Sequence, residues 1–213
     1  MKRALILDLD NTIYPVSSIA ENLFNQLFTL IDENPDNVND DDLQAAKDEM
    51  TRRPYQWVAD KYNFSPELKE KGMQLLKNIA YNLPMQPFEE YHILKTIPLT
   101  RFLVTTGFST LQWSKVRMLD IEKDFTEIHI VDPEVSTRTK RDVFADIMDR
   151  HGYTIEDILV IGDDPESEIK AATELGIDTF LFDPQRKHMD AAVTFRSANL
   201  SDVVKCLNRD SLD

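Results

Sequence analysis

Asp8 and Asp10 are the residues whose type and spacing most directly indicate chemistry in this chain. They end the apolar run Ala4-Leu5-Ile6-Leu7, which is typical of a buried strand in a parallel sheet. Ligands of open α/β sheets bind at the carboxyl ends of such strands. Two carboxylates at that position predict an acidic reactive site. A turn capped by Asp side chains is the alternative without catalysis.

Further polar residues stand where later strands end or later helices begin. Thr105 and Thr106 follow an apolar run, and Gly107 lets a ligand approach the backbone. Lys140 opens a predicted helix, and Asp163 follows another apolar run. Each of these residues alone is also compatible with a turn or a solvated surface. Together, in this order and at one edge of a sheet, they indicate a shared site.

The elements that must position these residues alternate between helix and strand from about residue 86 onwards. Strands are predicted over 101–104, 127–131, 158–161 and 178–182, and helices over 88–97, 111–119, 139–150 and 165–175. Such alternation predicts an α/β fold with a parallel sheet and helices on both faces. Residues 17–83 contain no convincing strand, and apolar residues at helical spacing predict four helices there.

The composition limits the partners and the kind of metal. The 213 residues include 24 Lys and Arg against 38 Asp and Glu, a net charge of −14, which disfavours nucleic acid and anionic membranes as partners. The four histidines lack zinc-ligand spacing and Cys206 is the single cysteine, so a hard cation held by carboxylates is expected instead. With no long apolar segment, a soluble, cytoplasmic protein is expected.

The motifs Asp8-Leu9-Asp10-Asn11-Thr12, Thr105-Thr106-Gly107, Lys140 and Gly162-Asp163-Asp164 resemble the four signatures of the haloacid dehalogenase-like (HAD) hydrolase superfamily. The resemblance implies a Rossmann-like three-layer core with five parallel strands in the order 3-2-1-4-5. Residues 1–14 and 86–213 would form this core, and residues 15–85 a helical cap of the C1 type. The continuation Ile13-Tyr14-Pro15 is similar to the pyrimidine 5′-nucleotidase subgroup.

The resemblance also implies a mechanism, phosphate-ester hydrolysis through an aspartyl-phosphate. Asp8 would be the nucleophile, and Asp10 the acid that protonates the leaving oxygen and the base that activates water. Because Asp10 must begin protonated, we expect burial and the charge of Asp8 to raise its pKa. Mg²⁺ would bind the Asp8 carboxylate, the Asp10 carbonyl and Asp163, and the phosphate oxygens would bind Thr105, Thr106 and Lys140.

Two further groups of residues are assigned supporting roles. Asp164 is expected to cap a helix beside the metal, and Glu168, where the motif often has Asp, to reach a metal-bound water or Lys140. Substrate choice is expected to come from the cap, whose basic and aromatic cluster is Arg52, Arg53, Tyr55 and Trp57, and from Phe108. Packing of Trp57 in the cap core, with solvated arginines, is the alternative.

The predicted reaction has several rivals. The presence of Asp10 favours a phosphatase over a dehalogenase, which characteristically lacks the second Asp. A phosphotransferase or mutase on sugar phosphates and a catalytically weak regulatory member of the fold remain open. A receiver-type signalling domain would be about half as long, and a dinucleotide-binding module would need a Gly-rich turn after the first strand. The expected partner is a small phosphorylated metabolite, with a nucleoside monophosphate or a sugar or acid phosphate as the leading options, bound by a monomer or homodimer.

Overall fold

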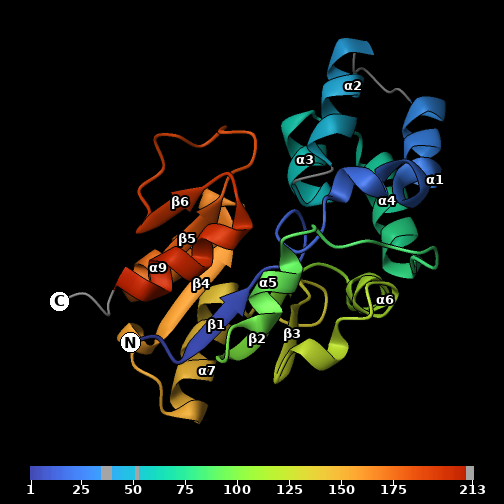
Figure 1. Ribbon diagram of the computed structural model, residues 1–213. Helices are drawn as coiled ribbons and strands as arrows, with labels where there is room; N and C mark the ends of the chain where they lie inside the picture. The colour runs from blue at the N-terminus through green and yellow to red at the C-terminus, as the bar shows by residue number, and fades with distance from the viewer. Residues whose placement is uncertain (35–39, 51–52, 210–213) are drawn as a thin grey trace.

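The core of the fold is a parallel sheet, seen in a computed structural model that describes residues 1–34, 40–50 and 53–209 (Figure 1). Its strands are β1 (Ala4–Leu7), β2 (Thr100–Thr106), β3 (Glu127–Val131), β4 (Ile158–Gly162), β5 (Asp178–Phe182) and β6 (Phe195–Ser197). Within the described residues the strand order is β3-β2-β1-β4-β5-β6. The predicted order of the first five strands is confirmed. The sixth strand was not predicted, because its three residues are only half buried at the edge.

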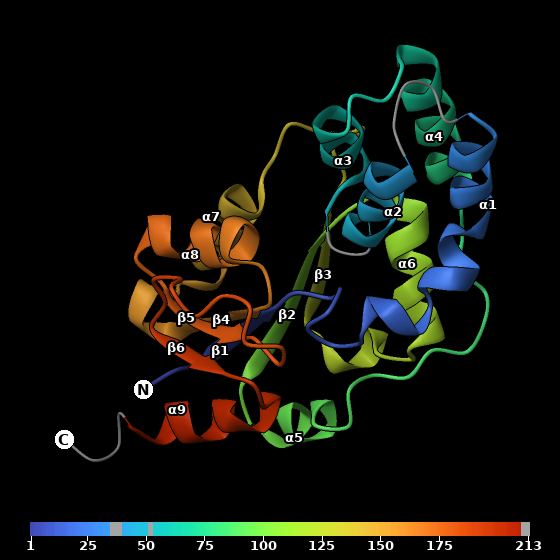
Figure 2. The same ribbon diagram turned by 90° about the horizontal axis from the view of Figure 1, so that it is seen from above.

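Helices cover both faces of this sheet, as predicted. Leu5 and Leu7 of β1 belong to one apolar cluster, and Ala4 and Ile6 belong to another, because successive side chains of a strand point to opposite faces. Figure 2 shows α7 (Lys140–His151) and α8 (Lys170–Leu175) over one face, and α5 (Tyr91–Thr96) and α9 (Val203–Arg209) over the other. The result is the predicted three-layer arrangement.

A group of helices lies between β1 and β2 in the chain. These helices are α1 (Ala20–Glu33), α2 (Asp40–Glu49), α3 (Tyr55–Lys61) and α4 (Pro66–Asn78), and they gather to one side of the sheet in Figure 1. The helix α6 (Ser109–Met118) packs against both α4 and β3. The two segments that lead into and out of this group touch, since the Phe88 amide donates to the Ile13 carbonyl at 2.8 Å.

Local signals at helix ends behave as the sequence predicts. Ser65 Oγ accepts a hydrogen bond from the Leu68 amide at 3.1 Å, so Ser65 caps α4 with Pro66 at the first helical position. Gly152 ends α7 in the left-handed region, at φ 63°. Short 3₁₀ helices occupy Val16–Ser18, Glu122–Asp124, Ile155–Asp157 and Leu200–Asp202.

The predicted helix over 165–175 is wrong in its first half. Pro165–Ile169 forms a π-helical turn, and the regular helix α8 begins only at Lys170. Ser167 interrupts the turn with non-helical angles, φ −113° and ψ −105°. This local departure matters for the site described below. Across residues 1–34, 40–50 and 53–209, we find no helix that combines the length and apolar character needed to span a bilayer.

Candidate active site

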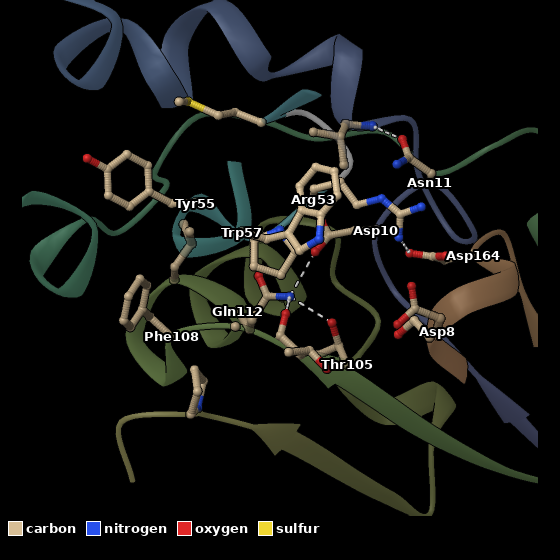
Figure 3. A pocket seen from close by; sticks show the side chains of 18 of the residues that line it. Asp8, Asp10, Asn11, Arg53, Tyr55, Trp57, Thr105, Phe108, Gln112 and Asp164 are labelled. Atoms are coloured by element: carbon tan, nitrogen blue, oxygen red, sulfur yellow. Dashed lines mark hydrogen bonds and ion pairs between the residues drawn. The ribbon is translucent and has the colours of Figure 1, made fainter. Parts of the chain in front are cut away.

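A cavity of about 630 Å³ opens at the carboxyl ends of β1, β2 and β4 (Figure 3). Twelve of the residues singled out in the sequence line it: Asp8, Asp10, Arg53, Tyr55, Trp57, Thr105, Thr106, Phe108, Lys140, Asp163, Asp164 and Glu168. Arg52, the remaining one, lies outside the described residues. Residues distant in the chain therefore meet in one cavity, because the parallel strands end at the same edge.

Lys140 joins two carboxylates at the base of the cavity. Its Nζ donates to Asp8 Oδ1 at 2.6 Å and to Glu168 Oε2 at 2.7 Å, and all three side chains are buried. The helix α7 holds Lys140 in place through a capping box, in which Thr139 and Asp142 bond each other's backbone amides. One ammonium group thus offsets part of the charge of two buried acids.

Burial and mutual repulsion disturb the protonation of these groups. Burial raises the pKa of the Asp8 carboxyl to about 7, with Glu168 adding to the shift and Lys140 opposing it. Burial also raises the pKa of Asp163 well above its usual range, and the charges of Glu168 and Asp8 add to it. Burial alone would lower the pKa of Lys140, but the two carboxylates beside it outweigh burial and raise it.

The residues at this point fit a divalent cation. Asp8, Asp163 and Glu168 each offer a carboxylate oxygen, and these oxygens lie within 4.8 Å of one another. Carboxylate oxygens are the ligands that Mg²⁺ prefers. Burial is the main cause of the raised pKa values of Asp8 and Asp163, and repulsion among the acids adds to it. A bound cation would favour the ionised forms and relieve that repulsion.

The π-helical turn brings Glu168 back toward the sheet. Glu168 Oε1 accepts a hydrogen bond from the Asp164 amide at 2.8 Å, while its other oxygen holds Lys140. A Cβ added at Gly162, the last residue of β4, would collide with the Glu168 carboxylate. In the segment Gly162-Asp163-Asp164, Gly162 therefore leaves room for the Glu168 side chain, and the Asp164 amide binds its carboxylate. A glutamate in place of the more frequent aspartate still reaches the lysine.

Asp10 accepts hydrogen bonds from a separate set of donors, which lie on α6 and in the loop that follows β1. Lys115 Nζ lies 2.8 Å from Asp10 Oδ1, Gln112 Nε2 donates to Asp10 Oδ2 at 2.8 Å, and the Tyr14 hydroxyl donates to Oδ1. Burial by itself would raise the pKa of Asp10, but Lys115 and the other donors outweigh it, so this pKa is lowered. The expectation of a raised pKa for Asp10 is wrong, because the sequence did not reveal these partners.

Gln112 also connects Asp10 to the end of β2. Its Nε2 donates to Thr105 Oγ1 at 2.7 Å and to the Thr106 carbonyl at 3.2 Å. Gly107, at φ 147°, lies close to this side chain, since an added Cβ would approach Gln112 within 3.2 Å. Thr105 is 1% exposed, whereas Thr106 is exposed at the cavity wall.

An ion pair crosses the cavity between the helical insert and the sheet edge. Arg53 Nη1, just before α3, lies 2.6 Å from Asp164 Oδ2. The same guanidinium lies 5.7 Å from the centre of the Trp57 ring, whose side chain is 47% exposed. Trp57 therefore does not fill the core of the insert, and Arg53 is not simply solvated. Asp164 also accepts from the Glu166 amide at 2.9 Å, the capping role predicted for it.

Comparison with known proteins identifies the family of this chain. The profile of the haloacid dehalogenase-like hydrolases matches residues 5–182, which span the greater part of the sequence. The chain is a haloacid dehalogenase-like hydrolase. The superfamily predicted from the four motifs is thereby confirmed, while the nucleotidase subgroup is not.

Relatives of this hydrolase include a phosphatase. The glyceraldehyde 3-phosphate phosphatase of Methanopyrus kandleri is 23% identical over 238 residues, which cover 99% of this chain and 100% of that protein. Solved structures share the fold. They include the hydrolase-family protein SP0104 of Streptococcus pneumoniae (18% identical, TM-score 0.75, covering 97% and 98% of the two chains). The magnesium-bound HAD-hydrolase YfnB of Bacillus subtilis is 20% identical, with TM-score 0.68, covering 97% and 99%.

Dehalogenases share the fold of this hydrolase too. The 2-haloacid dehalogenase of Pseudomonas syringae is 16% identical with TM-score 0.61, covering 98% of this chain and 99% of its own. At this identity the likeness shows the fold alone. The choice between hydrolysis of phosphate esters and dehalogenation therefore depends on the residues of the site.

Three residues of the site were missed in the sequence: Gln112, Lys115 and Tyr14, the donors that hold Asp10. A signal for two of them was present. Gln112 and Lys115 are three residues apart and share the inward stripe of α6 with Leu111 and Val116, where polar residues are unusual. Both are nearly inaccessible, at 1% and 5% exposed, so they needed a buried partner.

Proposed function

We propose that this hydrolase is a Mg²⁺-dependent phosphatase that cleaves a small phosphorylated metabolite through an aspartyl-phosphate. The observation that carries the proposal is the pairing of two carboxylates in one cavity, Asp8 beside Lys140 and Asp10 beside Lys115. A nucleophile and a separate acid or base are what ester hydrolysis in two steps needs. The distant phosphatase relative supports the same reaction class.

Asp8 would attack phosphorus, and the P–O bond to the leaving alcohol would break. Lys140 can neutralise charge on the transferring group, because its Nζ already lies 2.6 Å from the attacking carboxylate. Thr105 and Thr106, at the end of β2, would bind the non-bridging oxygens. Water would then attack the aspartyl-phosphate, releasing inorganic phosphate and regenerating Asp8.

Asp10 would move the protons of both steps. Lys115 and the other donors lower the pKa of Asp10 before substrate binds. The negative charge of an arriving phosphate would oppose Lys115 and favour the protonated form of Asp10, which would then give its proton to the leaving oxygen. The ionised Asp10 can take a proton from the attacking water in the second step. A haloalkane needs no acid for its leaving halide, so this second Asp favours the phosphatase.

Mg²⁺ would bind Asp8, Asp163 and the Asp10 carbonyl, and Glu168 adds a carboxylate within reach. When bound, the ion supplies the positive charge that lets a carboxylate approach a phosphate. We further propose that residues 15–85 act as a cap over the core formed by 1–14 and 86–213. Nucleoside monophosphates, sugar phosphates and acid phosphates are the substrate classes to test, in a cytoplasmic monomer or homodimer.

Hydrolysis of 4-nitrophenyl phosphate, with and without Mg²⁺, tests this proposal. Wild type should release 4-nitrophenol only with the metal, and Asp8→Asn should lower kcat by about 10³-fold or more, since it removes the nucleophile. Asp120→Asn is the matched control, because it makes the same change outside the cavity where φ is 53° and Asn is tolerated. Metal-independent turnover, or an active Asp8→Asn protein, would contradict the proposal.

A further inference from the structure

The cavity has an acidic end and an apolar end. Figure 3 shows Tyr55 and Phe108 on the side away from Asp8. The apolar lining of the cavity also includes Phe24, Met50, Leu76 and Leu111, contributed by the helical insert and α6. A phosphate held beside Asp8 and Lys140 would therefore point its alcohol at apolar walls.

Two polar groups that line the cavity, the Tyr55 hydroxyl and the Gln112 amide nitrogen, donate hydrogen bonds within the protein. The Tyr55 hydroxyl donates to the Leu68 carbonyl at 2.8 Å, which leaves the ring of Tyr55 to face the cavity. Burial raises the pKa of Tyr55 to about 12, so its hydroxyl stays neutral. Gln112 Nε2 donates to Asp10 and Thr105. Releasing these bonds to recognise sugar hydroxyls would leave buried groups without partners, which is costly.

The charges of the cavity disfavour a second anionic group on the substrate. Among its described lining residues, six carboxylates face three cations. Each cation is paired: Arg53 with Asp164 at 2.6 Å, Lys115 with Asp10 at 2.8 Å, and Lys140 with Asp8 and Glu168. When Asp10 carries its proton, a divalent ion balances the remaining charges, and the bound phosphoryl group makes the site negative again. A carboxylate or second phosphate on the leaving alcohol would be repelled.

We propose that the substrate is a phosphate monoester with a single phosphoryl group, whose alcohol is uncharged and ends in an apolar ring. This inference rests on the proposed phosphatase function and names its substrate class. The volume of about 630 Å³ accommodates a ring of this kind, and burying it against Phe108, Tyr55 and Leu111 gives hydrophobic free energy.

The test compares esters of primary alcohols, so that the alcohol's reactivity is similar while its shape and charge differ. With Mg²⁺, we expect kcat/KM for 2-phenylethyl phosphate to exceed those for glycerol 1-phosphate, 3-phosphoglycerate and uridine 5′-phosphate by about tenfold or more. A higher kcat/KM for any of these three would overturn the inference and leave the phosphatase proposal intact.

Variants locate the preference in the apolar wall. In Phe108→Ala, the ratio of kcat/KM for 2-phenylethyl phosphate to that for glycerol 1-phosphate should fall about tenfold, because the ring loses its contact. Phe108→Leu should restore most of the ratio. Met189→Ala, an exposed apolar residue outside the cavity, is the matched control. An unchanged ratio in Phe108→Ala would contradict the proposed contact.

Binding separates this inference from the failure of the phosphatase proposal. Calorimetry with Mg²⁺ should show 3-phenylpropylphosphonate, which cannot be hydrolysed, binding about tenfold or more tightly than 3,4-dihydroxybutylphosphonate. If no ester is hydrolysed, the phosphatase proposal fails while the ratio of the two Kd values still decides the inference. Equal or reversed affinities would overturn it.

Discussion

Asp10 shows how strongly a single residue depends on its neighbours. Its two carboxylate oxygens accept hydrogen bonds from Lys115, Gln112 and the Tyr14 hydroxyl. Burial and the charge of Asp10 raise the pKa of Tyr14 well above its usual value, so this hydroxyl keeps its proton. An acid or base works only when its oxygen is aimed at the reacting atom. These neighbours fix that aim before substrate arrives.

Replacing Lys115 tests this positioning role. Lys115→Met keeps most of the aliphatic stem and removes the ammonium group, so Asp10 loses one of its donors. We expect kcat with 4-nitrophenyl phosphate to fall about tenfold or more, within the range that acid and base catalysis contributes, and KM to change less. Arg117→Met, on the exposed face of α6, is the control. An unchanged kcat would show that Asp10 needs no support from Lys115.

At the scale of elements, the π-helical turn Pro165–Ile169 places Glu168 beside Lys140 at the acidic end of the cavity. A regular helix would carry Glu168 along the helix axis, whereas the turn lets it reach back to Lys140 and the Asp164 amide. Such turns inside helices are frequent at functional sites. Gly162 makes room for the returning side chain.

A substitution at Gly162 tests that arrangement. Gly162→Ala should displace the Glu168 carboxylate, lower the free energy of unfolding by about 1–3 kcal/mol and raise the Mg²⁺ concentration needed for half-maximal activity. In Glu168→Ala the same added methyl group meets empty space, so its effect on Tm should shrink. Thermal unfolding of the two single variants and the double variant measures this coupling. Additive changes in stability would contradict it.

A second link between elements gives a pH-dependent stability. Glu127 on β3 accepts hydrogen bonds from Arg150 near the end of α7, and from His151 and His129. These bonds hold the pKa of Glu127 well below its usual range, although burial opposes them. A lowered pKa in the folded state stabilises the protein above the unfolded pKa of about 4.3, and this contribution is lost as the pH falls below that value.

Glu127→Gln removes the ionisable group and so reports this linkage. The variant should unfold at lower temperature than wild type at neutral pH, and the difference should narrow as the pH falls below about 4. Glu122→Gln, an exposed carboxylate in the segment before β3, is the control. The measurement is Tm against pH for all three proteins. A constant difference down to low pH would contradict the assigned cause.

At the scale of the whole molecule, the net charge of −14 acts on every substrate before contact. A phosphate ester is repelled by this field, and salt screens the repulsion over a Debye length of about 10 Å at 0.1 M. We therefore expect kcat/KM for 2-phenylethyl phosphate, at saturating Mg²⁺, to rise as NaCl increases from about 0.01 M to about 0.15 M. A steady fall would mean that local cations dominate the approach of substrate.

The sequence by itself determined the strands and their terminal residues. The apolar runs that precede Asp8, Thr105 and Asp163 are buried strands, and their length and patterning are local properties. Because parallel strands end at one edge, the meeting of Asp8, Lys140 and Asp163 also followed from the sequence. Helix ends such as Ser65 were predictable for the same reason, since a cap depends on neighbours a few residues away.

Tertiary structure alone decided the state of the groups at the site. The pKa of Asp10 depends on Lys115, 105 residues away in the chain. The expectation that burial and the charge of Asp8 would raise this pKa gave the wrong direction. The same holds for Arg53, which reaches Asp164 across 111 residues, and for the π-helical turn that aims Glu168. Electrostatic and packing energies depend on distance in space, and only the folded chain fixes those distances.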